Sequence, residues 1–207
     1  MAATDTKQKI LDASLQLFNE NGISSVRLQQ IADETGISVG NLAYHFNNKE
    51  AIAETLITTV ISSLQELLRQ YGKYPPLPDL DFFFKTFYQL SSQYRFFNFD
   101  ILEIKRTFPA SYELLQPLFN KVKLQLERRF DLCLQQRLLQ KDANIKNIAA
   151  NVWLLLFFMP AEAQLNGKNT ITAHQYRRRL WNYLSLYFTA KGSTEYSTEI
   201  EPEFTGS

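Results

Sequence analysis

The chain has 207 residues, of which 45% are hydrophobic and 14% aromatic, and its formal net charge is +1. This composition excludes a strongly basic tail and an acidic solvating protein, and the length is sufficient for a well-buried core. The single cysteine, Cys133, excludes a disulfide within the chain and indicates a reducing compartment.

Two features favour a soluble protein. The first residues, MAATDTKQKI, lack the apolar core of a secretory signal. The longest apolar run, VWLLLFFMPA at 152–161, is much shorter than the roughly 20 residues that a membrane span needs. We therefore expect a cytoplasmic protein without a membrane partner.

Hydrophobic residues recur at helical spacing along nearly the whole chain, which predicts an all-α fold. The first helix is predicted over 5–19 and ends at Asn21-Gly22. A short second helix is predicted over 28–35, where Gly36 permits a left-handed turn. Ser38 is a suitable N-cap for a third helix that extends to Phe46.

The capping-box spacing of Asn47 and Glu50 predicts the start of a long fourth helix that ends near Gln70. A proline-rich break follows at 74–78. Beyond it, helices are predicted over 79–96, 98–107, 110–140, 144–165 and 172–189, with a kink at Pro117. The acidic tail is expected to be disordered, so the predicted division is a head at 1–48, a helical domain at 49–190 and a tail at 191–207.

The three short helices at the start have the pattern of a helix-turn-helix unit, in which the third helix enters the DNA major groove. On that helix Leu42 and Phe46 share the inward face, while Tyr44 points away from them. Gly40 would let the backbone approach DNA closely, Asn41 would bond a base or phosphate, and Val39 and Ala43 would contact thymine methyls. The remaining predicted contacts, all to the sugar-phosphate backbone, come from Arg27, Ser38, Tyr44, His45 and Lys49.

Three segments, KQKILDASLQLFNENG, VRLQQIADETGISVGNLAYHF and NNKEAI, together resemble the N-terminal domain of the TetR family of bacterial transcriptional repressors. The resemblance covers about residues 7–56. It implies a homodimer that binds double-stranded operator DNA. It also implies a larger helical domain that binds a small effector and dimerises through a four-helix bundle made by the last two helices of each subunit.

The sequence departs from this family pattern in two places. Ala43 stands where the family often has an aromatic residue, and Arg27 stands where it often has a hydroxyl residue. The head is also poor in cations, because residues 1–50 hold four basic and six acidic side chains, a net charge of −2. Non-specific DNA affinity should therefore be weak, since the basic footprint usual for such a head is missing.

Aromatic residues are concentrated in DFFFKTFYQLSSQYRFFNF, residues 81–99. Most of them would fill a helical core, but an aromatic-lined pocket between helices is also a normal small-molecule site. The implied effector is apolar or aromatic. The candidate effector-binding residues are Phe83, Phe87, Tyr94, Phe97, Phe99, Trp153 and Phe157.

Two other classes of function remain open. One is a small-molecule carrier or enzyme that uses the aromatic pocket, with the N-terminal unit structural. The other is an adaptor that binds a protein through its phenylalanine-rich surface. Because two distant histidines and one cysteine support neither a metal cluster nor a nucleophile–base set, we expect no metal, no cofactor and no catalysis. The run Arg177-Arg178-Arg179 is interpreted as charges at the rim of an interface, and His174 as structural.

Overall fold

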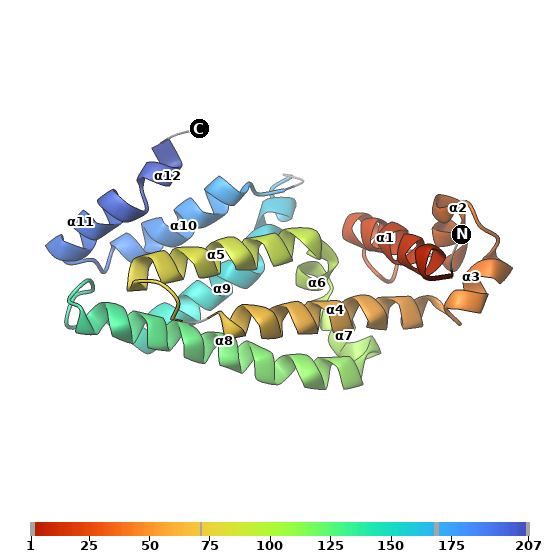
Figure 1. The fold of residues 1–207 in the computed structure, drawn as a ribbon, viewed down its shortest axis with the longest axis horizontal. Coiled ribbons are helices and arrows are strands. Elements are labelled where there is room, and N and C mark those ends of the chain that lie inside the picture. The colour runs from red at the N-terminus through yellow and green to blue at the C-terminus, as the bar shows by residue number, and fades with distance from the viewer. Residues whose placement is uncertain (1–2, 71, 168–169, 206–207) are drawn as a thin grey trace. The chain divides into compact units, whose positions relative to one another are not determined.

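The computed structural model describes residues 3–70, 72–167 and 170–205. In these ranges the chain forms twelve α-helices and no strand, only an isolated bridge between Leu139 and Phe188 (Figure 1). The predicted all-α fold is therefore confirmed. The chain divides into two compact units, Met1–Ser63 with Tyr94–Leu115 and Leu64–Gln93 with Gln116–Ser207.

The first unit contains the predicted head and a segment from the middle of the chain. Its core is apolar, with side chains from α1 (Ala3–Asn21), the turn after it and α2 (Leu28–Thr35) packed against the buried side of α3 (Val39–His45). The buried side chains are Ile10, Phe18, Ile23, Val26, Ile31, Ala32, Leu42 and Phe46. The helices of this unit are α1 (Ala3–Asn21), α2 (Leu28–Thr35), α3 (Val39–His45), the start of α4 (Lys49–Arg69), α6 (Arg95–Phe99), α7 (Ile101–Thr107) and the start of α8 (Pro109–Gln135).

Local chemistry sets the boundaries of the short helices in this unit. Gly36 ends α2 in the left-handed conformation, with φ of 68°. The Ser38 hydroxyl accepts a hydrogen bond from the Asn41 amide at 3.1 Å, which confirms its predicted capping role. At the start of α4 the cap is Asn48, whose Oδ1 accepts from the Ala51 amide at 2.8 Å, so the prediction that Asn47 caps this helix was wrong by one residue.

The second unit is built around three helices that pack on one another, α5 (Pro76–Gln93), α9 (Ile145–Leu165) and α10 (Ala173–Ser185). Aromatic pairs join them, and the ring centroids of Phe84 and Trp181 are 5.5 Å apart. The end of α4 and the rest of α8 belong to the same unit. The chain then forms α11 (Ala190–Glu199) and α12 (Pro202–Thr205), the dark-blue helices of Figure 1.

The structure differs from the predicted boundaries at several loops and in the tail. The segment predicted as one helix over 98–107 breaks at Asp100 into α6 and α7, and the helix predicted over 110–140 ends at Gln135. The tail, expected to be disordered, is helical over 190–199 and 202–205. It folds because Thr189 caps α11 through the Gly192 amide and Ile200 is buried, contacts that its acidic composition conceals.

Two helices, α4 and α9, are long and apolar enough to cross a membrane by length and composition. The core helix of a soluble protein meets the same criterion, and a good part of each apolar segment is buried inside the protein. These helices are therefore weak indications of a membrane span.

Candidate nucleic-acid interface

Helix α3 presents two different faces, as its periodicity predicted. Leu42 is fully buried and Phe46 nearly so, while the Tyr44 side chain is 83% exposed. Ser38, Gly40 and Asn41 are exposed beside it. The outer face is thus small, polar and aromatic, without carboxylates that would repel a phosphate.

Gly40 is not required by the fold. A Cβ atom built at this position meets no heavy atom closer than the Ser38 hydroxyl, 4.0 Å away, and its φ is not in the left-handed region. Glycine in a helix costs about 0.5–1 kcal/mol relative to alanine. The intramolecular structure therefore gives no reason for a glycine on this exposed face, and an external surface that approaches the backbone closely would give one.

The other predicted contact residues surround this position at different degrees of exposure. Val39, Ala43 and His45 are half-buried, and the His45 ring packs edge-on against Tyr44 with centroids 5.3 Å apart. Arg27 is exposed at the N-terminus of α2, and its backbone amide donates to the Gln30 side chain at 2.7 Å. The structure brings the α3 residues together on one surface and leaves Arg27 at the adjacent helix end.

Lys49 has an internal role that the sequence did not indicate. Its ammonium donates hydrogen bonds to the backbone carbonyls of Ile23, at 2.8 Å, and Ser24, at 3.3 Å. These carbonyls lie in the turn between α1 and α2. The predicted phosphate-binding lysine thus holds this turn against the first turn of α4.

The same turn is held from its other side by Asp100, at the junction of α6 and α7. The Asp100 carboxylate accepts a hydrogen bond from the Ile23 amide at 2.7 Å and lies close to Gly22, where a Cβ would stand 3.3 Å from its oxygens. Desolvation raises the pKa of the Asp100 carboxyl above its ordinary value, against the lowering effect of the Ile23 hydrogen bond. Both backbone polar groups of Ile23 are therefore bonded, its amide to Asp100 and its carbonyl to Lys49.

Two further contacts fix α6 to α1. The Asn19 side chain accepts from the Phe96 amide at 3.0 Å, and the rings of Phe18 and Phe96 pack edge to face at 6.1 Å. This anchor has no signal in the sequence, since Asn19 and Phe96 are 77 positions apart.

The structure divides the predicted effector-binding residues between the two units. Phe83, Phe87, Trp153 and Phe157 are buried in the second unit and pack ring against ring, with Phe87 and Trp153 centroids 6.3 Å apart and Trp153 and Phe157 5.3 Å apart. The other three belong to the first unit, where Tyr94 and Phe97 are buried and Phe99 is half-buried. We refer to the four residues of the second unit as the ring cluster.

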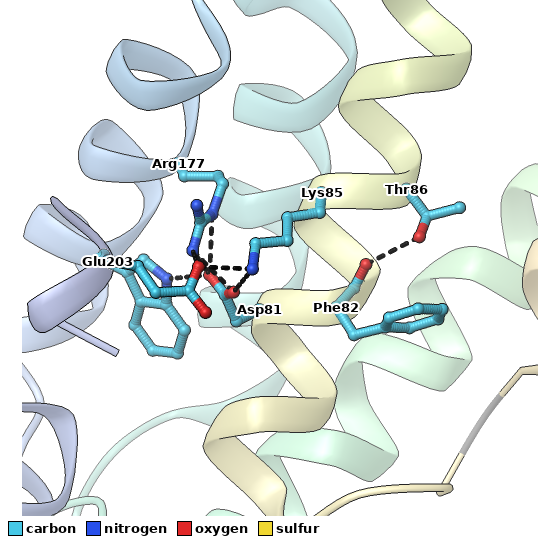
Figure 2. Close-up of polar contacts among 7 residues, drawn as sticks. Asp81, Phe82, Lys85, Thr86, Arg177 and Glu203 are labelled. Carbon is cyan, nitrogen blue, oxygen red and sulfur yellow. Dashed lines mark hydrogen bonds and ion pairs between the residues drawn. The ribbon is translucent and has the colours of Figure 1, made fainter. Parts of the chain in front are cut away.

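Arg177 is not a rim charge, contrary to the interpretation of the arginine run. Its side chain is only 9% exposed, and its Nε and Nη2 atoms donate to the Asp81 carboxylate at 2.7–2.9 Å (Figure 2). The Trp181 indole also donates to Asp81, at 2.9 Å. This pair could not be predicted from the sequence, because the partners are 96 positions apart and a charge inside a core is costly unless it is paired.

A second buried ion pair joins α8 to α5. The Nε atom of Arg129 donates to the Asp79 carboxylate at 2.8 Å, and both side chains are at most 4% exposed. The Arg129 guanidinium also lies over the Phe83 ring, 4.7 Å from its centroid. The ring cluster is therefore bordered by the Arg129 guanidinium, whose positive charge the Asp79 carboxylate already neutralises.

Neither Cys133 nor His174 has the surroundings of a reactive group. Burial raises the pKa of the Cys133 thiol to about 12, so the thiol stays protonated near neutral pH. The His174 ring packs edge-on against Phe204 at 5.3 Å, in agreement with its interpretation as structural. Among the residues that the structure describes, no group of three or more His, Cys, Asp or Glu could hold a metal ion.

Two family models match the chain. One, described as bacterial regulatory proteins of the tetR family, matches residues 10–56, and the other, described as a bacterial transcriptional repressor, matches residues 62–196. Curated relatives include the HTH-type transcriptional regulator AcrR of Shigella flexneri, 35% identical over 77 residues, and RutR of Escherichia coli, 29% identical over 94 residues. These alignments span 37% and 45% of this chain but only 36% and 44% of the relatives.

Solved structures match over the whole chain at lower identity. A TetR-family regulator from Marinobacter aquaeolei superposes with a TM-score of 0.80 at 22% identity, covering 99% of each chain. The TetR-family protein CprB from S. coelicolor superposes with a TM-score of 0.77 at 16% identity, covering 100% of each. The triclosan complex of SmeT reaches 0.60 at 22% identity, covering 90% of this chain and 93% of that one.

Proposed function

Because the chain belongs to the TetR family of bacterial transcriptional regulators, we propose that it is a cytoplasmic repressor that binds operator DNA as a homodimer and releases it on binding a small apolar or aromatic effector. The observation that carries the DNA-binding part of this proposal is the outer face of α3. There an exposed glycine that the fold does not require lies among exposed polar and aromatic side chains.

In the proposed complex α3 lies in the major groove. Gly40 allows its backbone to approach the DNA, Asn41 bonds a base or phosphate, and Val39 and Ala43 contact thymine methyls. Ser38, Tyr44, His45 and Arg27 contact the sugar-phosphate backbone. Lys49 contributes less than its position in the sequence indicated, because its ammonium is bonded to the turn before α2.

The test is a pair of substitutions on this face, Gly40→Ala and Tyr44→Ala. Gly40→Ala should stabilise the protein by about 0.5–1 kcal/mol and yet weaken operator binding, because the new methyl group separates α3 from the DNA. Tyr44→Ala should leave stability unchanged, since the side chain is 83% exposed, and should cost about 1 kcal/mol of binding through a lost phosphate contact.

The measurements are urea denaturation and operator affinity, on a site selected from random DNA. Gln16→Ala, on the exposed side of α1, is the control and should change neither quantity. If Gly40→Ala stabilises the protein and binds operator as tightly as the original chain does, α3 is not the surface that contacts DNA.

Dimerisation is proposed through α9 and α10. Leu154, Phe158 and Leu165 follow one face of α9, and they are 51%, 47% and 88% exposed. Leu186, directly after α10, is 69% exposed. Burial of these side chains against their copies in a second subunit would remove a large apolar patch from water with one self-complementary surface. Two more helices, α11 and α12, follow α10. The helices α9 and α10 are therefore not the last two of the described chain, whereas the sequence predicts that 144–165 and 172–189 are the last two.

A charge on this face should separate the subunits. Phe158→Glu should give a monomer by light scattering, and operator affinity should fall because the two half-sites are no longer bound together. Gln164→Glu, an exposed position on the same helix, is the matched control and should stay dimeric. A Phe158→Glu protein that remains dimeric would place the interface elsewhere.

The effector is proposed to bind at the ring cluster, which offers an apolar, aromatic environment. A ligand can lower operator affinity only if it binds the DNA-incompetent state more tightly, and a tenfold loss requires about 1.4 kcal/mol of difference. Apolar and aromatic compounds that raise the melting temperature should therefore weaken operator binding. Compounds that saturate the protein without changing operator affinity would show that the site is not a switch.

A further inference from the structure

The last helical turn of the described chain presents a carboxylate and an aromatic ring side by side to α5 and α10. In α12, Glu203 accepts hydrogen bonds from Lys85 of α5 and, at 3.0 Å, from Nη2 of Arg177 on α10 (Figure 2). The neighbouring Phe204 ring lies 4.7 Å from the Arg177 guanidinium. The two side chains together have the shape of an aromatic carboxylate held on two cations.

The Asp81 carboxylate is neutralised by Lys85 and Arg177 whether or not Glu203 is present. The Asp81 carboxylate already accepts two hydrogen bonds at its Oδ1 from Arg177, one there from the Trp181 indole, and contacts from Arg177 and Lys85 at Oδ2. Without Glu203 the group consists of two cations and one anion. Because Arg177 is only 9% exposed, its charge is poorly screened by water, and a second anion at this place is favoured.

A groove of about 400 Å³ lies beside the contact. Its lining combines the rings of Trp181, Tyr196 and Phe204 with polar and charged side chains, namely Arg178, Asn182, Ser185 and Glu201. One part of its wall is therefore aromatic, and its edge carries one positive and one negative charge. The hydrogen bond from Lys85 holds the pKa of the Glu203 carboxyl below its ordinary value, as expected where the surroundings stabilise an anion.

We propose that Lys85 and Arg177, with the aromatic groove beside them, form a binding site for a small aromatic carboxylate, and that Glu203 and Phe204 occupy this site as an internal substitute for the ligand. The carboxylate of the ligand replaces that of Glu203 on the two cations, and its ring takes the place of Phe204 over Arg177. This site is separate from the ring cluster and does not depend on the DNA-binding proposal.

Displacement of α12 should require little free energy. The helix has four residues, the Glu203 side chain is 48% exposed, and its ion pair with Lys85, itself 38% exposed, is screened by water. The tethered side chains nevertheless compete at an effective concentration of order millimolar. A free ligand should therefore bind weakly to the original chain and more tightly once Glu203 and Phe204 are replaced.

The experiment is calorimetric titration of the full chain with 1-naphthoate, in the absence of DNA. The double variant Glu203→Gln/Phe204→Ala should bind 1-naphthoate at least tenfold more tightly than the original chain. The uncharged 1-naphthamide should show no such gain. Adding Lys85→Met to the double variant should abolish the gain, because it removes one of the two cations. Glu199→Gln, at an exposed position of α11, is the control and should not alter the affinity.

Two results would overturn the proposal: equal affinity of the folded double variant and the original chain for 1-naphthoate, or an equal gain for the amide. Thermal unfolding verifies that the double variant is folded. If it is not, Glu203→Gln alone provides the same comparison with a smaller expected gain of about threefold. Because no DNA is present, failure here leaves the proposed repressor function intact, and failure of the repressor function leaves this result intact.

Discussion

The two units of this protein hold themselves together by different means. In the first, an apolar core is supplemented by side chains that bond a single turn of backbone, where Lys49 bonds the carbonyl of Ile23 and Asp100 bonds its amide. In the second, two buried ion pairs, Arg129–Asp79 and Arg177–Asp81, cross between helices. Arginines that the sequence presents as candidates for binding a polyanion are thus internal in the second unit, while the surface proposed to face DNA contains few cations.

The largest effect is expected from removing one member of a buried ion pair. Arg129→Met should destabilise the second unit by about 3–5 kcal/mol, because it leaves the Asp79 carboxylate buried without its partner. Urea denaturation measures this, and Arg128→Met, exposed on the same helix, should change stability by less than about 0.5 kcal/mol. Adding Asp79→Leu to Arg129→Met should recover most of the loss. Equal effects at positions 128 and 129 would contradict the role given to the buried pair.

The next effect concerns two glycines with opposite surroundings. A Cβ at Gly192 would stand 2.0 Å from the Leu138 carbonyl oxygen, which is backbone and cannot move aside easily. Gly192→Ala should therefore destabilise by about 1–3 kcal/mol and release α11, which amide hydrogen exchange over 190–199 would detect. Gly40→Ala, in the first unit, should stabilise instead. If both substitutions act alike on stability, the glycine of α3 is structural after all.

A smaller effect is expected where the two units end a helix with the same backbone motif and different residues. Gly36 follows α2 at φ 68°, and Arg137 follows α8 at φ 60°. In both places the amide of this residue and the amide of the next residue donate hydrogen bonds to carbonyls in the last turn of the helix. Arg137→Gly should stabilise by about 0.5–1 kcal/mol, whereas Gly36→Ala should destabilise by a similar amount. Chemical denaturation of both variants checks the signs, and destabilisation by Arg137→Gly would mean that its side chain contributes more than its backbone conformation costs.

The smallest effect is the dependence of stability on pH at Asp100. Burial raises the folded-state pKa of this carboxyl above its ordinary value of 3.8, so the folded protein binds more protons than the unfolded chain between the two values. Its contribution to stability therefore falls as pH rises through that window and stays unfavourable above it. Asp100→Asn keeps an oxygen that can accept from Ile23 and carries no charge.

This variant should be more stable than the original chain at pH 7, and the difference should shrink as the pH falls from the raised pKa to the ordinary value of 3.8. The difference between the two proteins isolates Asp100 from Glu203, Glu103 and Glu66, whose lowered pKa values act in the opposite direction. A difference that does not vary between pH 3 and pH 7 would show that the Asp100 charge carries no penalty in the folded state.

Much of the fold could be predicted from the sequence because the features concerned are local. Helix α2 was predicted at its observed bounds, and the two faces of α3 follow from periodicity, which fixes Leu42 inward and Tyr44 outward. The cap at Ser38 and the turn at Gly36 depend only on residues within one helical turn. The resemblance to the family rested on the same local order of elements.

Only the tertiary structure decided which charges and rings are internal. Arg177 and Arg178 are adjacent in sequence, yet one is paired with Asp81 in the core and the other is exposed. The hydrogen bond from the Ile23 amide to Asp100 is likewise decided by tertiary structure. So is the folding of the tail, which depends on the close contact of Gly192 with Leu138. These contacts join positions 50 to 100 residues apart, so they depend on the packing of whole helices. The pattern of residues within one helix carries no information about the partner that another helix supplies.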